Sequence, residues 1–444
     1  MKDTNEVNKS LPMQGDLEGL NSSLPMQGGM EGLFFELLQV AIGNRKTLTR
    51  PLTDDEWGTL YGICEKQALL GIAFAGVERL PKEQYPPFDV LAEWVHDAQV
   101  AKDRNKKLSR ECVDVCELLA KNGISSCVIK GQSNIINYPE HLKKHRTCGD
   151  IDLWCLPRNN DRIHKGIANI VEYARRYRQE HNQPDIPWHR VLYYHVEMNL
   201  DSGTEVELHY RPSYLNCFWR NSRLQNWFEN NRQFESLKSP EGFPIPTNSF
   251  NAIYQLLHIY KHLFEEGIGL RQILDYYFVL QTLSQETPLV PLRRGKMRLP
   301  ESPCVGGEVR DDILGGRTGA QTSPPMQGDL EGLISSFGMK KFASAMMYVL
   351  QTVFAMPDEY LICKPDEKEG RFLLNEIIQA GNFGKYDKRI KRVEGSCLKV
   401  QCNHAFEKWK HNLRLIAHYP EEVLWEPLFR LYHFVWRKFR LWKF

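Results

Sequence analysis

Apolar residues recur every three or four positions through residues 34–119, and this spacing predicts a helical N-terminal region. Thr53 stands directly before three acidic residues, which is typical of the start of a helix. Residues 91–123 combine apolar and charged positions as in one long amphipathic helix that ends at Gly123. We therefore expect helices to fill residues 34–120.

Short apolar runs replace this pattern after Gly123. The runs ISSCVIKG (124–131) and DIDLWCL (150–156) are typical of buried strands, and residues 162–181 have the spacing of a helix. Residues 190–213 alternate about the triplet Asp-Ser-Gly, which predicts a β-hairpin. The pattern thus indicates a small mixed sheet between helices.

Helical spacing returns after Asn248 and, with one interruption, continues toward the C-terminus. The predicted fold class is α+β. The expected organisation is a disordered tail (1–33), an N-terminal helical region (34–120), an α/β core (121–247), and a C-terminal helical region (248–444) with a disordered insertion (287–333).

The tail and the insertion share a repeated sequence. SLPMQGDLEGL starts at Ser10, SLPMQGGMEGL at Ser23 and SPPMQGDLEGL at Ser323, too far apart to stack as a solenoid. Residues 287–333 are rich in Gly, Pro and Arg and follow no helix or strand period, so they offer little apolar surface to bury. We predict a surface insertion between two helices, with a docking motif as the alternative.

Composition narrows the class of protein only a little. The formal net charge is +2, so no strong overall field would recruit nucleic acid. The sequence has no apolar run of about 18 residues and no apolar signal segment, which predicts no transmembrane span. Eleven cysteines at irregular spacing, without Cys-x-x-Cys, favour reduced thiols and a cytoplasmic location.

Candidate chemistry is concentrated in the predicted strands. Asp150 and Asp152 are two positions apart, so on a strand they would point to one side, about 7 Å apart along it. Glu207, in the second half of the predicted hairpin, can project to the same side. Three such carboxylates could bind two divalent ions, either Mg²⁺ or Mn²⁺. Glu207 is also a candidate base for the acceptor hydroxyl. Surface aspartates paired with Lys or Arg are the alternative reading.

The segment before the aspartates adds a candidate phosphate site. Gly131 and Ser133 follow the first strand and precede a predicted helix, and such a turn offers backbone N–H groups to a phosphate. Lys130 and Arg146 add positive charge on either side of this turn. His209 shares the predicted strand face of Glu207, where it could reach a nucleotide or belong to a structural polar cluster.

The order of these motifs resembles the bacterial uncharacterised nucleotidyltransferase family, within the superfamily that has the polymerase-β-like fold. The resemblance rests on the following segments: Ile129-Lys130-Gly131, Tyr138-Pro139, Arg146, Asp150-Ile151-Asp152-Leu153 and Glu207-Leu208-His209-Tyr210. The resemblance implies transfer of a nucleoside monophosphate from an NTP such as ATP, with Mg²⁺ or Mn²⁺. Gln132 stands where the superfamily usually has Gly or Ser, and Glu207 stands where Asp is commoner in the family.

The sequence therefore predicts Asp150, Asp152 and Glu207 as catalytic and metal-binding residues. The predicted nucleotide-binding residues are Lys130, Gly131, Ser133, Arg146 and His209. The acceptor could be a small molecule, a protein or an RNA end. Two alternatives remain, namely an inactive NTP-binding regulator and a sugar-nucleotide glycosyltransferase with an Asp-x-Asp motif.

The C-terminal segment 428–444 interleaves aromatic and basic residues. Its apolar positions cover most of a helix circumference, which favours a helix docked on the core. A membrane-surface helix and a surface for stacking nucleic-acid bases are the two alternatives.

Overall fold

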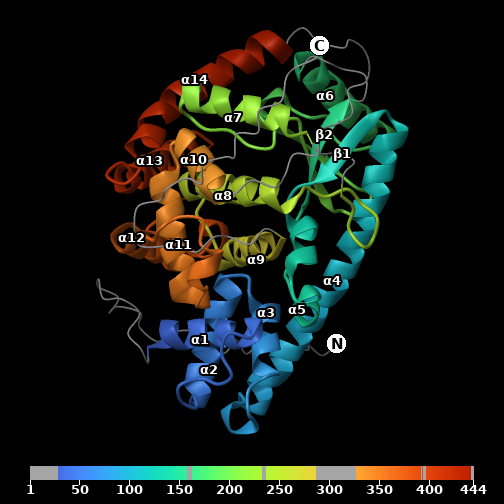
Figure 1. Ribbon diagram of the computed structural model, residues 1–444. Helices are drawn as coiled ribbons and strands as arrows, with labels where there is room; N and C mark the ends of the chain where they lie inside the picture. The colour runs from blue at the N-terminus through green and yellow to red at the C-terminus, as the bar shows by residue number, and fades with distance from the viewer. Residues whose placement is uncertain are drawn as a thin grey trace, which may run out of the picture.

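A small four-stranded sheet lies between helical layers, which confirms the predicted α+β class (Figure 1). The computed structural model describes residues 29–157, 163–232, 237–286, 327–391, 393 and 397–441. The predicted disorder of residues 1–28 and of residues 287–326 lies outside the described residues.

The N-terminal region is helical, as its apolar spacing predicts. Its elements are α1 (Met30–Ile42), α2 (Asp54–Lys66), α3 (Leu70–Val77), η1 (Lys82–Gln84) and α4 (Phe88–Lys121). Thr53 caps α2 in a capping box with Glu56, so each residue satisfies a free backbone N–H group of the other. Gly123, just after α4, has a φ of 73°, a left-handed conformation that favours glycine at a helix end. Helix α4 runs along one side of the molecule, from the N-terminal helices to the sheet (Figure 1).

The sheet contains one parallel and two antiparallel pairings. Its strands are β1 (Ile124–Val128), β2 (Ile151–Pro157), β3 (His195–Asn199) and β4 (Glu205–His209), in the order β1-β2-β4-β3. Strands β2 and β4 are parallel, whereas β1 pairs with β2 and β3 with β4 in antiparallel fashion. Strands β3 and β4 form the predicted hairpin, with Gly203 left-handed at its turn. The segment between β1 and β2 contains η2 (Gly131–Asn137) and α5 (Glu140–Lys143).

Alternation along the central strands decides which side chains face the core. Ile151, Leu153, Val206 and Leu208 are buried in one apolar cluster with residues of α4 and of α6 (Ile163–Glu180). Full burial of such a side chain is worth about 1.5–3 kcal/mol. Neighbouring strand residues point to opposite sides of the sheet. This packing therefore places Asp152 and the other residues of its face on the side away from α6.

The remaining helices complete the fold around a second apolar cluster. They are η3 (Trp188–Arg190), α7 (Phe218–Asn230), α8 (Asn248–Glu265), α9 (Leu270–Glu286), α10 (Gln327–Ser336), α11 (Lys340–Phe354), η4 (Asp358–Tyr360), α12 (Glu367–Ala380), η5 (Asn382–Gly384), α13 (Cys397–Leu415) and α14 (Pro420–Leu441). The cluster joins residues of α1 and α3 to residues of α8, α9 and α11. Gln39 and Asn44 donate hydrogen bonds to the carbonyls of Val353 and Phe354. The two helical regions predicted as separate units therefore share one core.

Two folded helices begin inside the repeated segments. Helix α1 starts at Met30 and α10 at Gln327, so both lie partly within segments that the composition predicts to be disordered. Leu33 is the last residue of the second repeat, and Leu330 lies three residues before the end of the third; both are buried in the helical core. In the described part of the chain, the end of each repeat is thus the first part of a packed helix.

Helix α14 docks on the core through one of its faces. Phe429 stacks on Tyr214 with ring centroids 4.8 Å apart, and Trp436 packs edge-on against Tyr193. The opposite face carries exposed apolar residues: Leu424, Leu428, Leu431, Val435 and Phe439. This two-sided pattern explains why apolar residues cover so much of the helix circumference. Within the described ranges, no helix is long and apolar enough to cross a membrane.

Candidate active site

Three carboxylates converge at the edge of the β2–β4 pair. Asp152 on β2 lies opposite Glu207 on β4 in the parallel register, and Asp150 directly precedes β2. One carboxylate oxygen from each of the three residues lies within 4.8 Å of the others. Only 1% of the Asp152 side chain is exposed, against 22% for Glu207 and 38% for Asp150. The predicted convergence of these three acids is therefore present in the fold.

The ammonium group of Lys130 lies among these carboxylates. Its Nζ atom is 2.7 Å from Asp152 Oδ1, 3.9 Å from Glu207 Oε2 and 4.0 Å from Asp150 Oδ2. The backbone on both sides of the side chain is held in place, because Ile129 N–H donates to the Asp152 carbonyl and Gly131 turns the chain with a φ of 61°. A fixed cation thus offsets part of the negative charge of the three acids.

The protonation states follow from burial and from this charge cluster. Burial, together with the Asp150 carboxylate, raises the pKa of Asp152 to about 7, although Lys130 opposes the shift. Burial alone would also raise the pKa of Glu207, but Lys130 and the two nearby histidines hold it well below its usual value. The carboxylates outweigh the burial of Lys130 and raise its pKa well above the usual value. The site therefore favours a bound positive charge.

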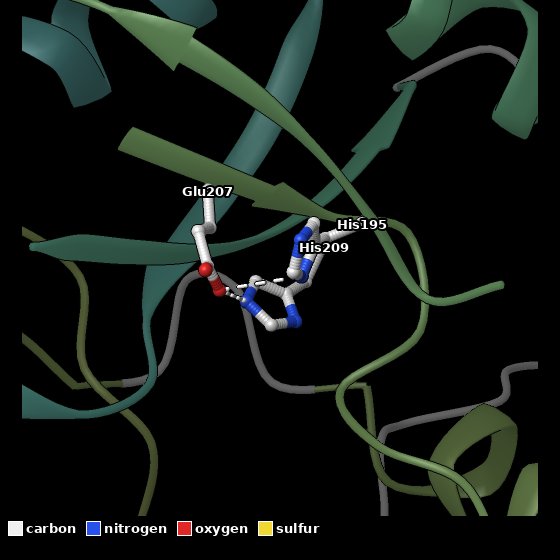
Figure 2. A group of neighbouring side chains, drawn as sticks. All are labelled: His195, Glu207 and His209. Atoms are coloured by element: carbon white, nitrogen blue, oxygen red, sulfur yellow. Dashed lines mark hydrogen bonds and ion pairs between the residues drawn. The ribbon is translucent and has the colours of Figure 1, made fainter. Parts of the chain in front are cut away.

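Two histidines flank Glu207 on the hairpin (Figure 2). His209 Nε2 lies 2.9 Å from Glu207 Oε2 and 3.1 Å from Asp152 Oδ1, while His195 Nδ1 lies 3.2 Å from Glu207 Oε2. Burial disfavours the charged form of His209, but its hydrogen bonds to the two carboxylates outweigh that effect and raise its pKa. Burial lowers the pKa of His195 well below its usual value. His209 thus links the two strands of the acidic cluster.

A cleft of about 1040 Å³ opens over these side chains. Lys130, Asp150, Glu207 and His209 lie in its wall together with residues of α4, the β3–β4 turn, α8 and the segment after α12. Cationic residues are frequent in this wall, namely Arg104, Lys107, Lys130, Lys261 and Lys385. The cleft is large enough for a nucleotide, because ligand pockets in proteins are typically about 300–1,000 Å³.

Comparison with known protein families identifies the family to which this chain belongs. The model of the family described as "Uncharacterised nucleotidyltransferase" matches residues 53–289, more than half of the chain. The chain belongs to the uncharacterised nucleotidyltransferase family. No curated protein and no solved structure matches it. The family match runs from α2 to just past α9 and contains the whole sheet, so it includes every residue of the acidic cluster. Membership supports nucleotidyl transfer as the general activity.

Two residues that sequence analysis predicts to bind nucleotide lie behind the cleft of this nucleotidyltransferase. Arg146 forms a buried, bidentate ion pair with Asp275 of α9. Its Nε lies 2.7 Å from Asp275 Oδ1 and its Nη2 lies 2.6 Å from Asp275 Oδ2. Ser133 is buried in η2, where its Oγ has no hydrogen-bond partner among the described residues. Neither residue is part of the cleft wall. Arg146 instead fixes the segment that leads to Asp150.

The turn at Gly131 opens a helix, as the sequence predicts, and this helix is the short 3₁₀ helix η2. Gln132 faces inward, where it donates to the Asn105 carbonyl and to Ser109 Oγ. The nucleotidyltransferase therefore uses this turn to direct Lys130 toward the acids and to anchor η2 on α4.

Two cleft residues of the polar face of α4, Arg104 and Lys107, carry no local signal of a site in the sequence. Lys261 of α8, more than 150 residues later in the chain, shares a helical stripe with His258 and His262, a spacing that favours a wall against the nucleotide base or the acceptor. Lys261 Nζ lies 3.3 Å from the centre of the Tyr194 ring, a cation–π contact at the cleft wall. Periodicity places such residues on a polar face but does not say which helices meet across the cleft.

Proposed function

We propose that this chain transfers a nucleoside monophosphate from an NTP to an acceptor hydroxyl and releases pyrophosphate, with Mg²⁺ or Mn²⁺ as cofactor. The observation that carries the proposal is the register pair of Asp152 and Glu207, which with Asp150 brings three carboxylates together inside the family-matched region. We propose these three residues as the catalytic and metal-binding residues.

The donor set fits a hard divalent cation. Asp150, Asp152 and Glu207 offer oxygen atoms, the ligands that Mg²⁺ and Mn²⁺ prefer. The position of the Lys130 ammonium, within 4.0 Å of all three carboxylates, supports this fit, because it marks a place where positive charge is stabilised. When bound, one or two such ions would neutralise phosphate charge and activate the attacking hydroxyl.

The protein groups around this site have separate tasks in the proposed reaction. Lys130 keeps positive charge beside the acids, and Lys261 adds a second ammonium group to the cleft wall, so that the negative charge of a triphosphate would meet two cations there. His209 Nε2 lies within hydrogen-bond distance of both Asp152 and Glu207, and through this one nitrogen it holds their carboxylates in fixed orientation. Glu207 reaches the cleft whereas Asp152 is buried, so Glu207 is the proposed acceptor of the hydroxyl proton.

The acceptor hydroxyl belongs to a small molecule, a protein or an RNA end. The described residues before β1 form helices rather than the nucleotide-binding α/β half that an Asp-x-Asp glycosyltransferase would need before its motif. This arrangement favours nucleotidyl transfer over the glycosyltransferase alternative.

The test uses the purified full chain with Mg²⁺ or Mn²⁺ and each NTP labelled in turn at the α- or the γ-phosphate. We expect α-label to appear on the protein or on a component of a cell extract, and Asp152→Asn to lower the rate about 10²–10³-fold. Asp201→Asn is the matched control, because Asp201 lies at the hairpin turn and outside the cleft wall.

Three outcomes would overturn the proposal. Transfer of γ-label would make the protein a kinase. Binding of NTP that raises the melting temperature, without movement of either label, would favour the regulatory alternative. Absence of any NTP binding would contradict the assignment of the acidic cluster as a metal–nucleotide site.

A further inference from the structure

We propose that His195, Glu207 and His209 form a second cation site beside the three carboxylates, one that takes a transition-metal dication such as Zn²⁺ and its spectroscopic substitute Co²⁺. The inference goes beyond the proposed reaction, because it concerns metal binding in the absence of nucleotide. It rests on the placement of two imidazoles and one carboxylate on the β3–β4 hairpin (Figure 2).

The strand register brings the three ligands together. His195 lies directly opposite His209, and Glu207 is two residues before His209 on the same face of β4. Glu207 Oε2 is 3.2 Å from His195 Nδ1 and 2.9 Å from His209 Nε2, and one ligand atom from each residue lies within 4.8 Å of the others. Tetrahedral zinc sites have ligand bonds of about 2.0–2.2 Å, so their donor atoms lie only slightly farther apart than these.

The ring nitrogens of His195, which make no hydrogen bond within the described residues, are the second, independent observation. Only 3% of this side chain is exposed, yet neither ring nitrogen makes a hydrogen bond to another described residue. Nδ1 approaches Glu207 closely enough for an ion pair but without hydrogen-bond alignment. Buried polar atoms nearly always make hydrogen bonds, so a buried imidazole that makes none and is turned toward a carboxylate indicates a missing partner. A metal ion would use the free nitrogen lone pair.

The chemistry of the donors separates this site from the neighbouring one. Imidazole nitrogen suits Zn²⁺ and other transition metals, whereas Mg²⁺ prefers oxygen. Two histidines and one glutamate match the donor set of known zinc sites. Glu207 is common to both sites, and His209 Nε2, which lies 3.1 Å from Asp152 Oδ1, would release its proton on binding the ion, so occupation of one site would change the contacts of the other.

The experiment titrates the metal-free full chain with Co²⁺ and follows the visible absorption that marks a low-coordinate nitrogen-ligated ion. We expect one Co²⁺ per chain and displacement by Zn²⁺ but not by Mg²⁺. His195→Gln should weaken Co²⁺ binding at least about 10- to 100-fold. His258→Gln is the matched control, because His258 is buried as His195 is but lies outside the cluster, and we expect this variant to bind Co²⁺ as the wild type does.

A second measurement does not depend on any variant folding. X-ray absorption of the Zn²⁺-loaded wild-type chain should contain the scattering of two imidazoles. Unchanged Co²⁺ binding in His195→Gln, or a zinc shell of oxygen or sulfur donors alone, would overturn the proposal. Because no nucleotide is present, failure here leaves the transfer reaction standing. Conversely, a failed transfer assay does not affect the metal-binding result.

Discussion

Arg146 and Asp275 form a buried ion pair that joins the segment before β2 to helix α9, 129 positions away in the sequence. Only 4% of each side chain is exposed, and Tyr138 donates a further hydrogen bond to the same carboxylate. Arg271, also on α9, donates to the Thr147 carbonyl in the same segment. The position of Asp150 at the cleft thus depends on a charge pair that lies behind it.

Removal of one partner from this pair should be costly. Asp275→Asn leaves the Arg146 charge buried without its counter-ion, so we expect a loss of about 3–5 kcal/mol in the free energy of unfolding, measured by urea denaturation. The exposed pair of Arg371 and Glu367 is the control, and Glu367→Gln there should change stability by less than about 1 kcal/mol. Equal effects at the two sites would contradict the buried-pair account.

Lys130→Met should make the protein depend on added metal. The substitution keeps much of the side-chain volume but leaves three adjacent carboxylates without their ammonium, so we expect a lower melting temperature in metal-free buffer. Mg²⁺ should raise that temperature more in the variant than in the wild type. Lys107→Met, at the rim of the cleft, is the control and should show no such gain. An equal Mg²⁺ response in all three proteins would show that the acids do not share a cation site.

Glu422 gives a pH prediction away from the cleft. Burial raises its pKa to about 8, and its carboxylate accepts a hydrogen bond from Asn216 N–H at 2.8 Å. Because the folded pKa lies above the unfolded one, the unfolded chain loses this proton first, and stability falls as pH rises from about 4.5 to about 8. The slope from this residue is at most about 1.4 kcal/mol per pH unit.

Glu422→Gln removes that proton equilibrium and keeps an acceptor for Asn216. We expect the variant to gain stability over the wild type progressively through this pH range, as followed by thermal unfolding at several pH values. A difference between the two proteins that does not vary with pH would contradict the assigned pKa.

The two apolar faces of α14 should respond in opposite ways to substitution. Phe429 is buried against Tyr214, so Phe429→Ala should cost about 3–5 kcal/mol of stability. Leu431 is 61% exposed on the opposite face, so Leu431→Glu should change stability by no more than about 0.5 kcal/mol. Chemical denaturation of both variants measures the contrast. A large loss in Leu431→Glu would mean that this face is packed in solution.

The acidic cluster could be predicted from sequence because strand geometry is local. A period of two puts Asp150, Asp152 and Glu207 on one side once the strands are placed, and buried neighbours such as Ile151 confirm which side that is. The partner of Arg146 could not be predicted in this way. A positive side chain near an acidic motif suits a phosphate and a buried carboxylate equally well, and only tertiary contacts distinguish them.

The helical regions also show that local sequence patterns do not predict tertiary packing partners. Apolar spacing places helices in residues 34–120 and after residue 248, yet it gives no sign that α1 packs on α11. Composition also gives the wrong expectation for the ends of the repeats. A Gly-rich segment is expected to bury few residues, yet Leu33 and Leu330 are buried in the core. Packing partners far apart in sequence supply the apolar contacts that local composition lacks.

The contact between α1 and α11 decides where this protein can be cut for laboratory work. The family match ends at residue 289, so a recombinant fragment that stops there would retain every acid of the cleft. It would also lose α11, which covers the apolar sides of α1 and α9. We expect that fragment to accumulate as insoluble aggregate when expressed beside the intact chain, whereas deletion of residues 290–326 from the intact chain should leave it soluble. Useful expression boundaries therefore follow the packed core rather than the limits of sequence similarity.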